Sequence, residues 1–200
     1  MSTRALIWPA AVVVLASGCA ALQSTDSGPG ALEPPPEAIV MSLDEASKAH
    51  HQAMRESLSA GELDEARAHH GRIDAEYLHH PDVRADRAAL ARLNGDHARA
   101  RQLYREVLVI EPGHPVASND LALMAREAGD MEESESLLLE ALEAHPERPR
   151  LHFNLAVLYE LYLMELAKAL EHYEQYRASS GEPDERVSGW IQDLERRVEG

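Results

Sequence analysis

The feature that most constrains the fold is a glycine followed by an acidic residue, which recurs every 34 residues. It stands at three places: Gly61-Glu62, Gly95-Asp96 and Gly129-Asp130. A small residue follows each glycine by five positions: Ala66, Ala100 and Ser134. Because glycine tolerates the left-handed backbone that ends a helix, this interval predicts repeated helix-turn-helix units, each folded back at its glycine.

The repeat resembles the tetratricopeptide repeat. Three copies span residues 47–80, 81–114 and 115–148, and a fourth begins at 149. The fourth copy has residues typical of the family's first helix at three positions: Leu155, Ala156 and Tyr159. The resemblance implies an all-α solenoid in which each helix pair buries its apolar face against its neighbours.

The fourth copy departs from the pattern at its turn. Leu163-Met164 takes the place of the glycine, and Ala169 and Tyr173 lie one residue later than in the other copies. This spacing predicts a one-residue insertion near the turn. We therefore expect a looser or wider turn in the fourth repeat.

The composition agrees with an all-α fold built on small residues. The chain is 44% hydrophobic but only 4% aromatic, so close helix contacts through alanine must do much of the packing. The four repeats are expected to fill residues 42–182. Helices are expected at 43–59, 62–79, 82–94, 96–110, 115–128, 131–144, 148–161 and 164–179.

The two ends of the repeat region carry helix signals of their own. Ser42 and Glu45 have the spacing of a capping box, which predicts the start of the first helix. Residues 183–200 are expected to form a capping helix that covers the last apolar face of the stack. Its apolar side chains share one helical face: Val187, Trp190, Ile191, Leu194 and Val198. We interpret Trp190 as a core residue, with partner binding as the alternative.

The N-terminal segment resembles a bacterial lipoprotein signal. Residues 1–18 have a basic start, an apolar run over Ala5–Ala16 and a small-residue cleavage site, and Cys19 follows directly. The resemblance implies that Cys19 is lipidated and becomes the first mature residue. Residues 19–41 then form a disordered, proline-rich tether. The alternatives are a retained transmembrane helix, for which the run is short, and secretion with cleavage near Ala21.

The net charge argues against two classes of partner. At −16, the chain repels nucleic-acid phosphates and anionic lipid headgroups. A solvated acidic exterior and a dedicated acidic binding surface are both compatible with this charge. We expect no nucleic-acid partner.

The sequence contains no recognisable catalytic motif. Among the 11 histidines, the adjacent pairs point about 100° apart on a helix and do not chelate a metal as residues four apart would. His50 and His70 are expected to approach each other across the first repeat, and the histidines suggest sensitivity to pH. We expect no metal site, no cofactor and no enzymatic activity.

The family resemblance places a binding groove along the first helices of successive repeats. Matching positions here mix cations, polar groups and apolar side chains, which suits an extended peptide or a helix. These positions are His51, Gln52, Arg55, Asp86, Ala89, Arg92, Asn119, Asp120, Leu123, Arg126, Phe153, Asn154 and Val157. As one alternative, the arginines pair with Asp86 and Asp120 inside the groove itself. As another, a partner binds a different face, such as the repeat edges or the last helix.

Together these features suggest an adaptor without catalytic activity, held by its lipid at the periplasmic face of the outer membrane. Residue 20 is alanine, not the aspartate that commonly retains such lipoproteins in the inner membrane. Repeat lipoproteins of this kind include pilotins for pilus or secretin assembly and adaptors for cell-wall enzymes. The alternatives are a self-associating structural envelope protein and, more weakly, a metal-dependent enzyme.

Overall fold

The computed structural model describes residues 42–181 and 184–199. The expected signal at 1–18, the lipidation site Cys19 and the tether at 19–41 lie outside this part. The helices in chain order are α1 Glu45–Ala60, α2 Leu63–His70, α3 Pro81–Leu93, α4 His97–Ile110, α5 Pro115–Glu127, α6 Met131–Ala144, α7 Pro149–Leu158, α8 Leu166–Ser179 and α9 Glu185–Glu199. A 3₁₀-helix, η1 Ala75–His79, precedes α3, and a π-helix, η2 Tyr159–Leu163, follows α7.

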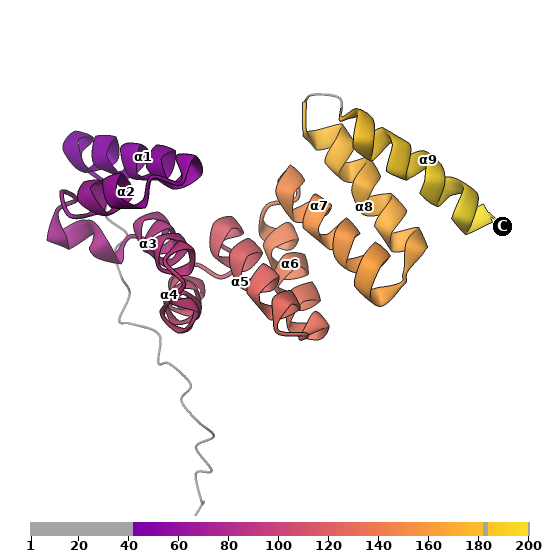
Figure 1. Ribbon diagram of the computed structural model, residues 1–200, viewed down its shortest axis with the longest axis horizontal. Coiled ribbons are helices and arrows are strands. Elements are labelled where there is room, and N and C mark those ends of the chain that lie inside the picture. Colours follow the sequence, from indigo (N-terminus) through magenta and orange to yellow (C-terminus); the bar gives the residue numbers. More distant parts are fainter. Residues whose placement is uncertain (1–41, 182–183, 200) are drawn as a thin grey trace, which may run out of the picture. The chain divides into compact units, whose positions relative to one another are not determined.

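The helices pack in sequence order as a tetratricopeptide-type α-solenoid (Figure 1). The pairs α1–α2, α3–α4, α5–α6 and α7–α8 form the four repeats, and each first helix also contacts the first helix of the next repeat. The second helix of each of the later repeats leads into the next element, as α4 does with α5 and α8 with α9. The predicted all-α solenoid is confirmed.

The glycine turns have one geometry in three repeats. Gly61, Gly95 and Gly129 all have a positive φ, at 77°, 82° and 87°. At the first turn, the Gly61 N–H donates to the Leu58 carbonyl at 3.2 Å and the Glu62 N–H to the Ser57 carbonyl at 2.9 Å. This pair of bonds satisfies carbonyls that the end of a helix leaves free, and it recurs at the other two glycines.

The fourth turn takes up the extra residue as a π-helix. The Glu165 N–H reaches back six residues to the Tyr159 carbonyl at 2.9 Å, one residue further than the equivalent bond in the other repeats. Met164 adopts the left-handed conformation, with φ 58°, where the other repeats have glycine. The predicted insertion is therefore a single wide helical turn.

The second helix of the first repeat is shorter than predicted. The expected helix at 62–79 ends at His70, where Gly71 is the C-cap, and η1 follows after a short turn. This turn lets Ile73 and Tyr77 bury their side chains with Leu43 and Val83 in the core of the first repeat. Burial of these apolar side chains outweighs the propensity to continue the helix.

The predicted capping box at Ser42 is wrong. Asp44 is the N-cap of α1, and its side chain accepts from the Ser47 backbone N–H at 2.6 Å. Leu43, the residue before this N-cap, is buried. The N-cap of α1 therefore lies two residues after Ser42, the predicted position. The hydrogen bond from Ser47 also lowers the pKa of Asp44.

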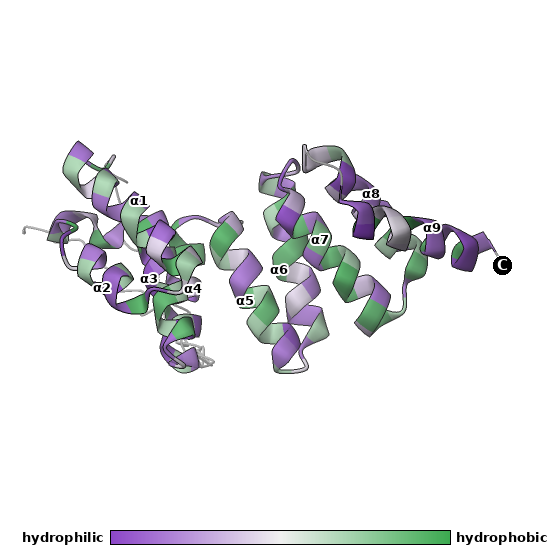
Figure 2. Ribbon diagram, turned by 45° about the horizontal axis from the view of Figure 1, so that its top comes forward, coloured by the Kyte–Doolittle hydropathy of each residue, from purple (hydrophilic) through white to green (hydrophobic). Residues whose placement is uncertain are grey.

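The core is built from small residues and few large ones, as the composition suggests. Around α3 and α4 the buried side chains include Ala85, Ala88 and Ala100 together with Leu103 and Tyr104. Figure 2 shows hydrophobic and hydrophilic residues alternating along the helices, as in helices with one buried face. Each repeat therefore buries its apolar face only against adjacent helices.

The apolar face predicted for α9 is confirmed in part. Val187, Ile191 and Leu194 are buried and belong to the core cluster of the fourth repeat. Trp190 is 41% exposed and Val198 43% exposed, so the interpretation of Trp190 as a core residue is wrong. In the part of the chain that the structure describes, no helix has both the length and the apolar character needed to cross a bilayer.

Candidate protein-binding surface

A row of polar residues runs along the first helices, at one equivalent position in each repeat. These residues are Gln52, Asp86, Asp120 and Asn154. The His51 Nε2 lies 2.7 Å from the Asp86 Oδ2 in the next repeat. Likewise the Asn154 Nδ2 donates to the Asn119 Oδ1 at 2.5 Å. Both bonds join residues 35 apart, so each ties the first helix of one repeat to that of the next.

Asp120 lacks a hydrogen-bonding partner on the preceding first helix, because alanine stands there, at position 85. The equivalent residues, His51 and Asn119, make the two bonds described above. The Asp120 carboxylate accepts from the Tyr104 hydroxyl at 2.6 Å and from the Asn119 Nδ2 at 3.0 Å. Burial raises the pKa of Tyr104 far above its usual range, and the neighbouring Asp120 charge adds to the shift. The hydroxyl therefore stays protonated and remains a donor at any physiological pH.

Most of the predicted groove residues are not fully open to a partner. His51, Asp86, Asn119 and Asp120 are buried in the contacts just described. Arg92, Leu123, Arg126, Phe153, Asn154 and Val157, together with Ala89, are half-buried, and only Gln52 and Arg55 are exposed. The first four hold the repeats together, and the remaining residues form the accessible part of this surface.

The arginines partly follow the alternative interpretation, in which they pair inside the groove. The Arg55 Nε lies 3.8 Å from the Asp86 Oδ2, and an Arg92 guanidinium nitrogen lies 3.7 Å from the Asp120 Oδ2. Both distances are too long for hydrogen bonds. The Arg55 side chain is 61% exposed, so its guanidinium keeps donors free for a carboxylate from another molecule. Arg126 instead lies over the ring of Tyr162, at 5.3 Å from its centroid.

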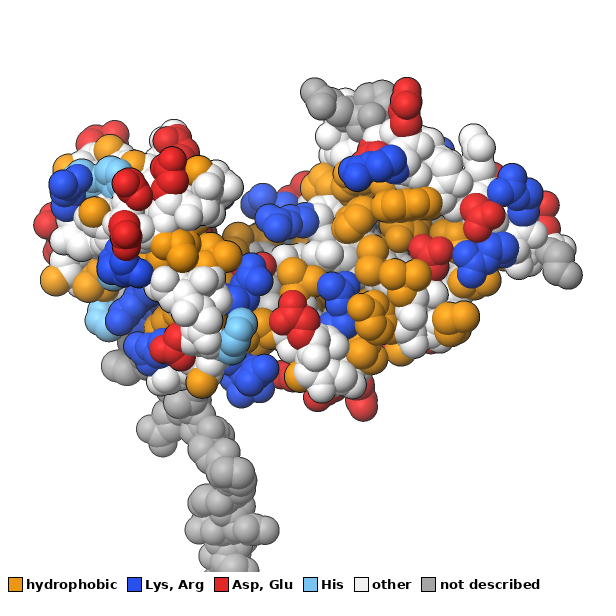
Figure 3. Space-filling model, in the orientation of Figure 1, with side chains coloured by type: hydrophobic (Ala, Val, Ile, Leu, Met, Phe, Trp, Pro, Cys, Tyr) orange, Lys and Arg blue, Asp and Glu red, His pale blue; other side chains and the backbone are white. Residues whose placement is uncertain are grey.

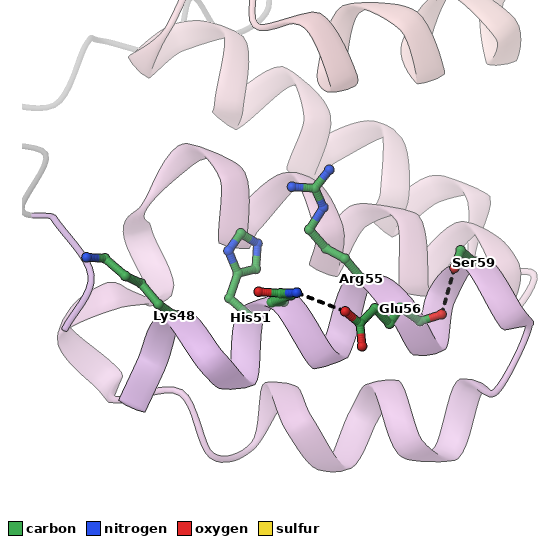
Figure 4. A pocket seen from close by; sticks show the side chains of 6 residues that line it. Lys48, His51, Arg55, Glu56 and Ser59 are labelled. Carbon is green, nitrogen blue, oxygen red and sulfur yellow. Dashed lines mark hydrogen bonds between the residues drawn. The ribbon is translucent and has the colours of Figure 1, made fainter. Parts of the chain in front are cut away.

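A hollow of about 540 Å³ opens beside α1. It is lined by Lys48, His51, Gln52, Arg55, Glu56 and Ser59. Figure 4 shows these side chains along α1. The Gln52 amide donates to the Glu56 carboxylate at 2.9 Å. Two cations and one carboxylate give the hollow a net positive charge, unlike the chain as a whole.

The opposite end of the surface is apolar. Leu123, Phe153 and Val157 are half-buried on α5 and α7. Figure 3 shows hydrophobic side chains gathered over α7 and α8, with lysine and arginine side chains beside them. The surface therefore changes from charged on the first repeat to apolar on the fourth.

Two pairs of histidines each join the two helices of one repeat. The His50 Nδ1 faces the Nδ1 of His69 at 3.4 Å, so the predicted approach of His50 to His70 is off by one residue. An equivalent pair joins His152 and His172 at 3.1 Å in the fourth repeat. In residues 42–181 and 184–199, no three of the possible ligands His, Cys, Asp and Glu are grouped so as to hold a metal ion.

The comparisons with known proteins now identify the repeat. The family model of the tetratricopeptide repeat matches residues 91–156. Residues 91–156 are tetratricopeptide repeats. The match runs from the end of α3 into α7, and the flanking helix pairs continue the same packing. A search of the curated proteins found no match.

Solved structures share the fold. A structure of PilF from Pseudomonas aeruginosa is 23% identical and superposes with a TM-score of 0.66, over 78% of this chain and 70% of that chain. MamA from Desulfovibrio magneticus RS-1 is 17% identical, with a TM-score of 0.56 over 79% of this chain and 88% of that chain. MamA from AMB-1 is also 17% identical, with a TM-score of 0.55 over 76% and 82%. Tetratricopeptide repeats, which the family model matches over residues 91–156, are typically scaffolds for protein–protein interaction.

Sequence reasoning missed two parts of this surface. The aromatic cluster around Trp190 was not recognised, although the concentration of aromatic residues near the C-terminus was a signal. The hydrogen bonds between repeats were also missed. Their signal was the 35-residue spacing of polar residues such as His51 and Asp86.

Proposed function

We propose that this protein is an adaptor without catalytic activity, anchored by a lipid on Cys19 at the periplasmic face of the outer membrane. It binds a segment of a partner protein along the first helices of its repeats and helps to assemble an envelope complex. The anchor confines the binding surface to one membrane, so modest affinity for a partner suffices.

The observation that carries this proposal is the exposed cationic hollow on α1. Asp86, the nearest buried acid, is already bonded to His51 at 2.7 Å and lies 3.8 Å from Arg55. The Arg55 guanidinium therefore has donors left over for a partner carboxylate, and the hollow beside it holds about 540 Å³. The bonds between repeats hold this surface in one geometry, which lowers the entropy lost on binding.

The test replaces the exposed groups and leaves the buried bonds in place. Gln52→Ala combined with Arg55→Ala removes polar groups of the hollow while His51 and Asp86 keep their contact. Partners are trapped by crosslinking in envelopes of a bacterial host and compared by mass spectrometry. We expect the specific partner to be lost from the double variant and retained by Arg72→Ala, an exposed arginine outside the hollow. An unchanged set of partners would sink the proposed surface.

The anchor has a separate test. Cys19→Ser removes the only thiol in the chain, so lipidation at this position cannot occur. We expect the variant in the soluble periplasmic fraction and the parent protein in the outer-membrane fraction. A variant that remains with the membrane would disprove the lipid anchor without affecting the binding surface.

A self-associating envelope protein is the second candidate, because the α7–α8 turn exposes apolar side chains. Leu161 is 62% exposed, Tyr162 47% and Met164 68%. Contiguous exposed apolar groups of this kind often mark a protein interface. Light scattering of the purified protein distinguishes the two, since a single species of monomer mass would exclude self-association as the main function.

A further inference from the structure

The aromatic residues of this chain gather where α7, α8 and α9 meet. Although aromatics make up only 4% of the sequence, the sole Phe lies against two Tyr and a Trp here. The Phe153 ring centroid is 5.3 Å from Tyr176 and 6.3 Å from Trp190, and Tyr173 is 5.7 Å from Trp190. Tyr173 is buried, but Trp190 is 41% exposed. The cluster therefore joins the core to the surface.

The packing of α9 explains why the cluster is open. In the repeats, α1 contacts α3, α3 contacts α5, and α5 contacts α7. No comparable backbone contact joins α7 to α9, which packs instead on α8 through Val187, Ile191 and Leu194. Phe153 and Trp190 thus meet through their rings, at 6.3 Å between centroids, without the close backbone contact that joins successive first helices.

An open hollow of about 400 Å³ lies beside this cluster. Its apolar wall is formed by Pro149, Phe153 and Tyr176. Its polar wall includes Arg150, Arg186 and Asp184. Arg186 pairs with Asp184 at 3.4 Å, whereas Arg150 is exposed and makes no ion pair with any residue that the structure describes. The charged groups of the hollow therefore carry a net positive charge, with Arg150 open to a carboxylate.

We propose that this hollow binds a partner segment in which an apolar side chain is followed by an acidic one. The apolar side chain packs on Phe153 and Tyr176, and the acidic side chain pairs with Arg150. Because the hollow is open and not closed at one end, the partner chain can continue past it. Tryptophan, tyrosine and arginine are the residues most enriched where a few contacts dominate binding. This inference rests on the proposed adaptor function and adds the chemistry of the partner.

The test uses Trp190 as its own reporter. The chain has two tryptophans, and Trp8→Phe leaves Trp190 as the sole one whether or not residues 1–18 are removed. The probe is the capped peptide acetyl-Gly-Ser-Gly-Phe-Glu-Gly-Ser-amide, whose blocked ends carry no charge. Two companions replace Phe with Ala or Glu with Gln. We expect a saturable change in Trp190 emission with the first peptide, and binding weaker by about tenfold or more with each companion.

Charge reversal then tests Arg150. Arg150→Glu lies on the surface, so its far-UV circular dichroism is expected to match the parent. It should weaken the Phe-Glu peptide by about tenfold or more and leave the Glu-to-Gln peptide nearly unchanged. Arg72→Glu makes the same charge change in the first repeat and should have no effect.

The inference would be overturned by no saturable change with the Phe-Glu peptide, by equal binding of the Ala peptide, or by full binding by Arg150→Glu. Binding that appears only when the peptide has a free C-terminal carboxylate would also overturn it, because the ligand would then be a chain end. The first-repeat variants do not touch this hollow. Loss of partners in those variants with no peptide binding here would disprove only this inference.

Discussion

At the scale of single residues, the periodic pattern placed polar side chains on the correct helices but not at the correct depth. Asp86 and Asp120 were expected to line an open groove, and both are buried acceptors. The pattern records which face of a helix a residue occupies. Whether that face is covered depends on His51 and Tyr104, which reach it from elsewhere in the chain.

The contact between His51 and Asp86 leads to a prediction about stability. Asp86→Ala leaves the buried Nε2 of His51 without its partner, which costs about 1–3 kcal/mol of unfolding free energy. Urea denaturation followed by circular dichroism measures the loss. Asp64→Ala is the matched control, because it removes an aspartate whose pair with Arg67 is exposed to solvent. Equal stability of the two variants would show that the buried bond contributes little.

At the scale of elements, the fourth turn shows how the fold absorbs a residue that breaks its period. The register of α8 is kept, since Ala169 and Tyr173 remain buried one residue later than in the other repeats. The extra residue widens the end of the first helix into a π-helix, and Met164 takes the conformation that glycine holds elsewhere. The sequence predicted the insertion, but the form of the turn came from packing on both sides of it.

A glycine at this turn should stabilise the protein. Met164 holds a φ of 58°, which costs a residue with a side chain about 1–2 kcal/mol, and its side chain is 68% exposed and loses little packing. Met164→Gly is therefore expected to raise the free energy of unfolding by about 0.5–1 kcal/mol, after the greater freedom of glycine in the unfolded chain is subtracted. Thermal denaturation gives the shift. Leu161→Gly, inside the π-helix, should not stabilise, and an equal gain there would contradict the explanation.

At the scale of the whole molecule, histidines couple the stability of the solenoid to pH. Burial lowers the pKa of His70, His80 and His172, and for His172 the nearby His152 adds to the shift. His70 and His80 lie in the first repeat and His172 lies in the fourth. Because each repeat is stabilised by its neighbours, local destabilisation at these sites weakens the entire stack.

The expected pH dependence follows from the direction of these shifts. Below about pH 6.5 the unfolded chain binds protons on these histidines before the folded chain does, so the free energy of unfolding falls as the pH drops. Urea midpoints at pH 7.5 and pH 5.0 measure the fall. His172→Gln should make it smaller, because one of the shifted groups is gone. An unchanged difference in that variant would show that His172 does not contribute. The hydrogen bond with His114 lowers the pKa of Asp82. This carboxyl changes the free energy of unfolding only at more acidic pH.

The sequence by itself determined the register of this protein. Glycines 34 residues apart marked where the helices turn, and the residues in phase with them marked which helices pair, because both follow from local backbone preference and period. Tertiary structure alone decided which polar residues became buried bonds, why α2 ends at His70 and why Trp190 reaches the surface. These outcomes depend on contacts between segments distant in the chain, such as His51 with Asp86 and Phe153 with Trp190, and no local pattern specifies them.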